Sequence, residues 1–355
     1  MPYDPYAEAR RMERVMRGEE KAQVVPAPEQ SAWMALKFGL FVHFGINTFH
    51  DTEWSDGNLP AASFAPSDLD TDEWADAAVS AGMKYLVLTT KHHDGFCLWP
   101  SDWTDYTVAN APGKVDVIER LADSCRRKGL KLGFYYSLWD RHEPSFEHDH
   151  GYALFMKRQL TELLTRYGEV VQLWFDGGWK KGGVHYQDPA RWYWREIYEH
   201  IKCIQPDCLV GNNGTSSRKG EIVLWPCDYR MGEKGLPSET DRRVWYCGGV
   251  GSYLPYESSY TLSKGGDGQG AFASGKWFWH ESDVTAQSPE WVLETLASCR
   301  VRGANLLLNA GPMASGRLRP IDLQTLAEVG KGVRERDLLS RTGETGGDAQ
   351  VAIDA

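Results

Sequence analysis

A polar residue stands at the end of a strongly apolar stretch in the middle of this chain. Residues 170–179 read Val-Val-Gln-Leu-Trp-Phe-Asp-Gly-Gly-Trp, so that Asp176 closes the apolar run and two glycines follow it. Such a run, rich in β-branched and aromatic residues, predicts a buried strand that ends in a carboxylate. In a barrel of parallel strands the carboxyl ends carry the chemistry, which makes Asp176 a candidate catalytic residue. An aspartate that caps a helix or stabilises a turn is the alternative.

Other predicted strands end in polar residues of the same kind, which favours the catalytic interpretation. They are His43, His92-His93-Asp94, Tyr136 and Asn212-Asn213. In a barrel these side chains converge on one pocket, where imidazoles bind sugar hydroxyls or, in a metal-dependent hydrolase, a divalent ion. Because His92 and His93 point in opposite directions if the strand continues, they make a poor chelate, and metal is the second interpretation.

These strand ends need a scaffold in which strands and helices alternate. Apolar runs predict strands at 35–45, 83–90, 130–137, 170–176, 208–211 and 305–312. Helical patterns cover 69–81, 115–128, 152–167, 189–204, 289–303 and 320–338, whereas 215–275 reads as irregular. Alternation over about 300 residues predicts an α/β fold of the (β/α) TIM-type barrel class. The chain has no GxGxxG after a strand and no GxxxxGK[ST], which argues against a dinucleotide fold and a P-loop.

Composition narrows the partners. The formal net charge of −10 argues against nucleic acid and anionic membranes as partners. The 15 Trp, 16 Tyr and 12 Phe suit stacking on sugar rings. We therefore expect a small-molecule or oligosaccharide substrate, no nucleic-acid or membrane partner, and leave a homo-oligomer open. The 7 Cys, without a CxxC pair, read as reduced thiols.

The chain divides into three parts on this interpretation. Residues 1–30 form an N-terminal extension, with a charged helix over 8–21 and an extended connector over 23–30. Residues 31–340 form the catalytic barrel, and the Gly- and Ala-rich residues 341–355 form a flexible tail. The extension has no apolar core of a signal peptide, so we expect a cytoplasmic protein; a secreted form whose signal is absent from this sequence is the alternative.

Five stretches resemble the α-L-fucosidases, family 29 of the glycoside hydrolases, in order and spacing. They are Lys-Phe-Gly-Leu-Phe-Val-His-Phe-Gly at 37–45, Thr-Lys-His-His-Asp-Gly-Phe at 90–96, Gly-Phe-Tyr-Tyr-Ser at 133–137, Leu-Trp-Phe-Asp-Gly at 173–177 and Asn-Leu-Leu-Leu-Asn-Ala-Gly-Pro at 305–312. The resemblance covers residues 33 to 335 and implies a single catalytic barrel, here without the C-terminal β-sandwich usual in the family.

The resemblance also implies an activity: hydrolysis of terminal α-L-fucosides with retention, without a metal or other cofactor. Asp176 matches the nucleophile of the family. The residues that match its sugar-binding positions are His43, Glu53, Trp54, His92, His93 and Tyr136. Trp277, in the variable region, is expected to wall the pocket or to pack the loops against the barrel.

The proton donor is harder to place, because the family carries it in the variable region after the strand at 208–211. One branch of the family has a Glu where this chain has Asn213, which cannot donate a proton to a leaving group. The other has an Asp-aromatic-basic-x-x-Glu stretch, which Asp228-Tyr-Arg-Met-Gly-Glu233 fits, so Glu233 is the predicted acid/base. Glu257 and Glu221 are the reserves, Glu257 also being a candidate for substrate binding. A solvated loop charge is the alternative for Glu233.

Two other functions stay open from the sequence. An arginine typical of the family is missing, since Asn212-Asn213-Gly214 stands in its place, which leaves the sugar specificity open. Together with the uncertain acid, this motivates a catalytically silent sugar-binding barrel. The histidine cluster motivates the metal-dependent hydrolase.

Overall fold

The computed structural model describes residues 24–178, 180–181, 184–185, 189–214, 218–247, 250–265 and 276–340. The helix predicted over 8–21 and the tail predicted over 341–355 lie outside these residues. A short helix, α2 (Pro28–Met34), begins inside the segment that the sequence predicted to be an extended connector. Pro28 is tolerated there because the first turn of a helix does not need its missing N–H group.

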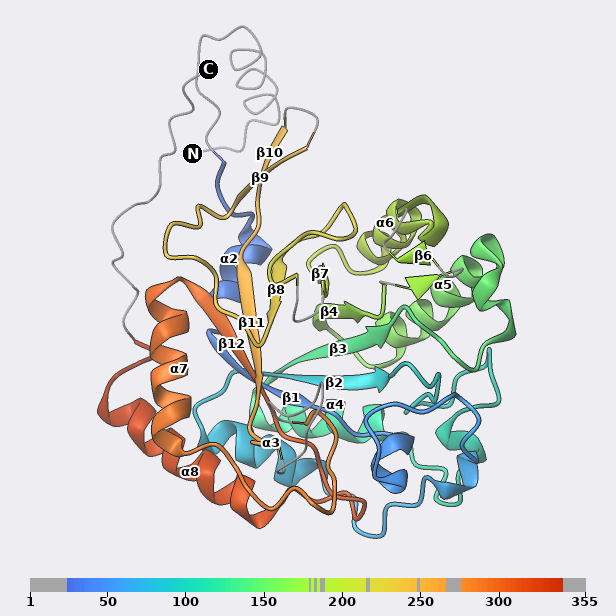
Figure 1. Ribbon diagram of the computed structural model, residues 1–355, viewed down its shortest axis with the longest axis horizontal. Coiled ribbons are helices and arrows are strands. Elements are labelled where there is room, and N and C mark those ends of the chain that lie inside the picture. Colours follow the sequence, from blue (N-terminus) through green and yellow to red (C-terminus); the bar gives the residue numbers. More distant parts are fainter. Residues whose placement is uncertain are drawn as a thin grey trace, which may run out of the picture.

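Eight parallel strands form one sheet that curves into a barrel, in the order β7-β4-β3-β2-β1-β12-β11-β8 (Figure 1). They are β1 (Phe38–Val42), β2 (Tyr85–Lys91), β3 (Lys131–Ser137), β4 (Val170–Asp176), β7 (Leu209–Asn212), β8 (Arg230–Glu233), β11 (Tyr256–Thr261) and β12 (Ala304–Asn309). Asp228 ties the two outermost strands: its N–H donates to the Val210 carbonyl, and its carboxylate accepts from the Val210 N–H. The predicted barrel class is confirmed.

Six helices lie outside the sheet, and none of the described residues between β7 and β11 is helical (Figure 1). The helices are α3 (Thr71–Ser80), α4 (Val117–Lys128), α5 (Asp149–Arg166), α6 (Trp194–Ile204), α7 (Pro289–Val301) and α8 (Pro320–Glu335). Asp70, Asp116 and Ser288 cap α3, α4 and α7 by accepting from the backbone N–H three residues on. Short antiparallel pairs join β5 (Lys180–Lys181) to β6 (Val184–His185) and β9 (Val244–Cys247) to β10 (Val250–Tyr253).

Alternation along the strands separates two apolar layers. In β1, Phe38, Leu40 and Val42 face the helices, whereas Phe41 faces the barrel interior. The interior also holds Tyr85, Val87, Tyr135, Trp174, Leu209, Tyr229, Met231 and Leu307. Trp33 of α2 fills the amino-terminal end of the barrel, and its Nε1 donates to the Gln172 side chain.

The segment predicted to be irregular contains two strands of the barrel. β8 is four residues long, and β11 buries Glu257, Ser258 and Ser259 instead of an apolar run. Neither has the hydrophobic pattern of a strand, which explains why the sequence pattern did not predict them. Glu233 is consequently the last residue of β8 and not a loop residue.

Candidate active site

A pocket opens at the carboxyl ends of the barrel strands. The residues that line it come from the ends of β1, β2, β3, β4, β7 and β8 and from two loops; they are Phe41, His43, Trp54, His92, His93, Tyr135, Trp174, Asp176, Asn213, Glu233 and Trp277. Seven of them were predicted as site residues: Asp176, Glu233, His43, His92, His93, Trp54 and Trp277. The barrel therefore gathers most of the predicted site, including residues 190 positions apart in the chain, Glu233 and His43.

Two carboxyl groups face the pocket from opposite sides of β7. Asp176 ends β4 and Glu233 ends β8, with the end of β7 between them. The Asn213 side chain bridges the two, because its Nδ2 donates to Asp176 Oδ1 at 3.1 Å and to Glu233 Oε2 at 2.8 Å. These two oxygens are therefore at most about 6 Å apart, which fits the spacing of retaining glycosidases and not the wider spacing of inverting ones.

The turn after Asp176 brings two loops into close contact. Gly177 has φ +75°, and a Cβ there would lie 2.8 Å from the Cβ of Trp139. Only glycine combines this backbone conformation with such a close approach. The glycine thus lets the loop after β3, which carries Trp139, pack directly on the end of β4.

Asp176 is held at both of its oxygens. Tyr135 donates its hydroxyl to Oδ2 at 2.8 Å, opposite the bond from Asn213 to Oδ1. Burial and, to a smaller extent, the neighbouring charge of Glu233 raise the pKa of Asp176 to about 7, although hydrogen bonds from Tyr135, the Gly177 backbone and Asn213 oppose the rise. The carboxyl group of Asp176 therefore changes its charge near neutral pH.

Two of the three pocket histidines have an assigned tautomer. His43 Nδ1 lies 2.7 Å from Asn309 Oδ1, which can only accept, since Asn309 Nδ2 donates to the Trp277 carbonyl. His93 Nδ1 lies 2.6 Å from the Ser137 hydroxyl, whose own hydrogen goes to the Trp139 carbonyl. Both Nδ1 atoms therefore carry hydrogen, and both Nε2 atoms are acceptors, that of His93 lying 3.7 Å from Asp176 Oδ2.

Burial keeps all three imidazoles neutral. It lowers the pKa of His43 and of His93 to about 3, and it lowers the pKa of His92 well below the ordinary value. His92 stacks on Tyr135, with ring centroids 5.4 Å apart, and its buried Nδ1 has no hydrogen-bond partner among the described residues. A buried polar atom without a partner is uncommon in native structures, and this one belongs to a residue that lines the pocket.

The expectation that His92 and His93 point in opposite directions was wrong. β2 ends at Lys91 after an irregularity in its pairing with β3, so the alternation of a strand no longer applies. Both rings line the pocket, with centroids 4.1 Å apart. Even so, no group of three or more His, Cys, Asp or Glu suited to a metal ion occurs among the described residues.

Tyr136 is a correction to the predicted site. Its hydroxyl donates to Gln159 Oε1 at 2.7 Å and accepts from Lys91 Nζ at 3.1 Å, on the helix-facing side of β3. Tyr135 takes the position in the pocket instead. The signal for this lay in the register: Asp176 and Trp174 share a face of β4, and Trp174 pairs with Tyr135.

Two of the predicted carboxylates lie away from the pocket, which corrects their assignment. Glu257 is fully buried inside the barrel, where it accepts from the Tyr85 hydroxyl at 2.7 Å and from the Gln172 amide, and burial raises its pKa to about 7. It has no access to a substrate in the pocket. Glu221 is exposed and pairs with Arg218.

Glu53 lies behind the pocket surface. Its carboxylate accepts from the Trp277 backbone N–H at 3.1 Å and pairs with His280 Nε2 at 3.0 Å. It is not among the residues that line the pocket. The structure thus makes Glu53 the support of Trp277, which in turn packs on His43 with ring centroids 5.1 Å apart.

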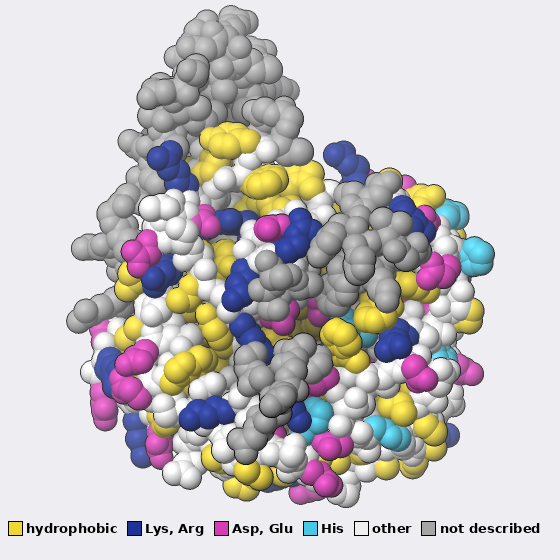
Figure 2. Space-filling model, viewed as in Figure 1, with side chains coloured by type: hydrophobic (Ala, Val, Ile, Leu, Met, Phe, Trp, Pro, Cys, Tyr) yellow, Lys and Arg dark blue, Asp and Glu magenta, His cyan; other side chains and the backbone are white. Residues whose placement is uncertain are grey.

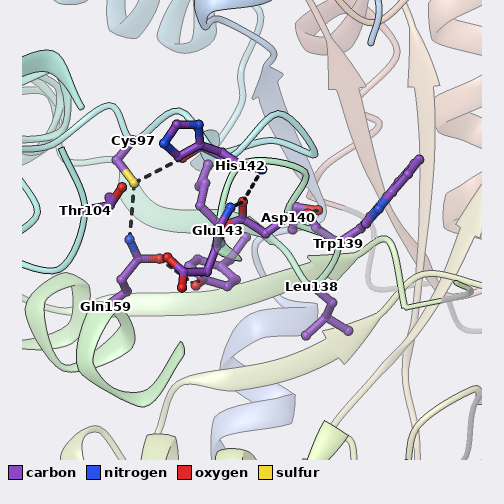
Figure 3. A network of polar contacts seen from close by, with 12 residues as sticks. Cys97, Thr104, Leu138, Trp139, Asp140, His142, Glu143 and Gln159 are labelled. Atoms are coloured by element: carbon purple, nitrogen blue, oxygen red, sulfur yellow. Dashed lines mark hydrogen bonds and ion pairs between the residues drawn. The ribbon is translucent and has the colours of Figure 1, made fainter. Parts of the chain in front are cut away.

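A buried ion pair supports the opposite wall. Lys91 Nζ lies 2.6 Å from Asp140 Oδ2, and neither side chain is accessible. Asp140 Oδ1 accepts from the backbone N–H groups of His142 and Glu143. Figure 3 shows this region, together with the hydrogen bond that Gln159 donates to the Cys97 sulfur. The pair ties the residue before the two histidines to the loop that carries Trp139. Trp139 packs on His93 and on Trp54, which is 44% exposed at the pocket mouth.

On the described part of the face shown in Figure 2, basic and acidic side chains are interspersed. No helix among the described residues has both the length and the apolar character needed to span a bilayer.

Fold and site together define a class: a (β/α) barrel with paired carboxyl groups and neutral histidines at the carboxyl ends of its strands. The model of the family described as alpha-L-fucosidase matches residues 10–336. The chain therefore belongs to the alpha-L-fucosidase family.

Individual relatives agree with this membership. Alpha-L-fucosidase 1 of Arabidopsis thaliana is 32% identical over 86% of this chain and 59% of its own length, and tissue alpha-L-fucosidase of Homo sapiens is 25% identical over 84% and 66%. The crystal structure of a glycoside hydrolase 29 family member from a rumen bacterium has a TM-score of 0.76 and 32% identity, over 89% of this chain and 58% of that one. The chain spans less than two thirds of the length of these relatives.

Proposed function

We propose that this protein is a retaining exo-glycosidase that hydrolyses terminal α-L-fucosides, free or on oligosaccharides. The observation that carries the proposal is the pair Asp176 and Glu233, bridged by one amide in a pocket with three neutral histidines. The names of the relatives support fucose as the sugar.

The proposed reaction has two displacements. In the first, Asp176 attacks the anomeric carbon while Glu233 gives its proton to the departing glycosidic oxygen, which yields a glycosyl ester and a free alcohol. In the second, Glu233 takes a proton from water, the water oxygen attacks the anomeric carbon, and Asp176 leaves as a carboxylate. The histidines accept or donate hydrogen bonds to the sugar hydroxyls, and Trp54 and Trp277 cover its apolar face.

Replacement of Asp176 tests the nucleophile. We expect Asp176→Ala to lower kcat on an aryl α-L-fucoside at least about 10⁴-fold, because no other group can form the ester. Glu221→Gln is the control, since Glu221 is exposed and pairs with Arg218 outside the pocket. Normal turnover by a pure preparation of Asp176→Ala would refute the assignment.

Replacement of Glu233 tests the acid. A dinitrophenyl leaving group needs no protonation, so Glu233→Gln should slow its release far less than that of an unactivated alcohol. The second step still lacks its base, and the glycosyl ester should accumulate as a mass increase on the protein. Equal losses of kcat/KM, which reports only the steps up to departure of the leaving group, on both substrates would remove Glu233 from the acid role. If calorimetry detects fucose binding by the wild-type protein without turnover of any aryl fucoside, the silent sugar-binding function replaces this proposal.

A further inference from the structure

We infer that Asn213 is a positioning residue that fixes how the two carboxyl groups face each other and which oxygen of Glu233 delivers the proton. The inference rests on the proposed function, because it assigns a role within that reaction. It concerns a residue that the sequence placed at a strand end facing the pocket and excluded as the acid, without a role of its own.

Asn213 directly follows β7, and the neighbouring strand β4 fixes its position. Its backbone N–H donates to the Phe175 carbonyl at 2.8 Å, next to the nucleophile in the chain. Its side chain is 3% exposed, which leaves it little freedom to turn. The amide is thus anchored to β4 while it reaches toward β8.

The amide group serves both carboxyl groups at once. A side-chain NH₂ has two hydrogens, and here one points to Asp176 Oδ1 and the other to Glu233 Oε2. The hydrogen bond to Asp176, together with that from Tyr135, holds the plane of the nucleophile. The bond to Glu233 holds a side chain that is the last of its strand.

This arrangement distinguishes the two oxygens of Glu233. Oε2 already accepts a hydrogen from the amide, so a proton there would compete with that bond. The proton of the neutral acid therefore belongs on Oε1, the oxygen turned away from the amide. Asn213 in this way directs the proton toward the leaving group and keeps it from Asp176, which must stay ionised to attack.

Removal of the amide gives a loss that depends on the leaving group. We expect Asn213→Ala to lower kcat/KM for an unactivated alkyl or phenyl fucoside roughly 10- to 100-fold, the size of one lost hydrogen bond to a charged group. The loss on a dinitrophenyl fucoside should be several-fold smaller, because that substrate does not need the proton. Asn213→Asp should not restore the activity, since a carboxylate cannot donate to both partners.

The neighbouring Asn212 supplies a matched control. It is equally buried, but its amide bonds the backbone of Leu224 and touches neither carboxyl group. Asn212→Ala should affect both substrates by the same factor, as expected of a structural role. An equal loss on both substrates with Asn213→Ala would overturn the inference.

A titration of the carboxyl groups tests the inference without turnover. With ¹³C-labelled aspartate and glutamate, NMR should show a higher pH midpoint for Asp176 in Asn213→Ala than in the wild-type protein, because a donor to the charged form is lost. Asn212→Ala should leave that midpoint unchanged. If the wild-type protein turns over no fucoside but Asn213→Ala still raises the midpoint of Asp176, the proposed function is refuted and the bridge stands. An unchanged midpoint in Asn213→Ala would overturn the bridge.

Discussion

The surroundings of Asp176 in the folded protein disfavour the charged form of its side chain. Its folded-state pKa of about 7 lies above the ordinary value of 3.8, because burial and the charge of Glu233 both disfavour the carboxylate. The folded state therefore binds this proton more tightly than the unfolded state. The stability that this provides is complete below pH 3.8 and is lost as the pH rises through about 7.

A neutral side chain at 176 should remove this pH dependence. We expect Asp176→Asn to raise the free energy of unfolding by an amount that grows between pH 4 and pH 8, up to about 4 kcal/mol. Chemical denaturation at both pH values measures the difference. A gain of the same size at pH 4 and pH 8 would show that the charge of Asp176 carries no such cost.

The sequence predicted which residues stand at the strand ends better than it predicted the direction of their side chains. Asp176 and His43 stand at strand ends, which a pattern of apolar runs reveals. Tyr135 and Tyr136 are adjacent residues of one type, and only the pairing of β3 with β4 decides which of them faces the pocket. The bridging role of Asn213 depends on β8, whose existence the pattern did not predict.

At the scale of the elements, the ends of β2 and β3 depend on each other. The Lys91–Asp140 pair lies between them without access to water, and it positions the turns that carry His92, His93 and Trp139. A buried ion pair adds little net stability, but the loss of one partner leaves the other charge buried and unpaired.

We expect Lys91→Met to lower the free energy of unfolding by about 3–5 kcal/mol and to weaken substrate binding through the displaced Trp139. Lys131→Met is the matched control, because the ion pair between Lys131 and Glu169 is exposed and should matter far less. Denaturant unfolding and KM measure the two effects. Equal unfolding free energies for the two variants would contradict the role of the buried pair.

Elements with an apolar face were predictable, and those without one were not. The predicted helices recur in the structure close to their expected bounds, with capping residues such as Asp116 and a glycine at the end of α4. The pattern did not predict β11 because its inward side chains include Glu257, whose pKa burial raises to about 7 and which Tyr85 and Gln172 hold by hydrogen bonds. A buried polar strand has no signature in a hydrophobic pattern.

At the scale of the whole molecule, the barrel is filled from one end by the chain that precedes it. Trp33 is 1% exposed and packs against Tyr229, with ring centroids 4.9 Å apart, at the end opposite the pocket. Its backbone carbonyl accepts from the Asn305 amide of β12. Residues before the first strand thus belong to the core of the barrel.

Trp33→Ala should lower the free energy of unfolding by about 3–5 kcal/mol, because it leaves a cavity in the barrel interior. The fraction of Trp33→Ala that remains folded should have the KM of the wild-type protein, since the pocket lies at the opposite end of the barrel from Trp33. Trp245→Ala, on the β9–β10 hairpin and 41% exposed, is the control and should unfold nearly as the wild-type protein does. A comparable unfolding free energy for both variants would show that α2 does not complete the core.

The described residues between Asn213 and Pro255 form one flank of the barrel without a helix of their own, and Asp228 ties this segment to β7. Insertions or replacements there need not disturb the packing of six helices against the sheet. The surroundings of the two carboxyl groups should consequently differ in how many substitutions they tolerate. Asp176 ends a strand that the helices of the barrel cover, whereas Glu233, the proposed proton donor, lies in a segment without a helix, so substitutions around Glu233 should disturb the core less.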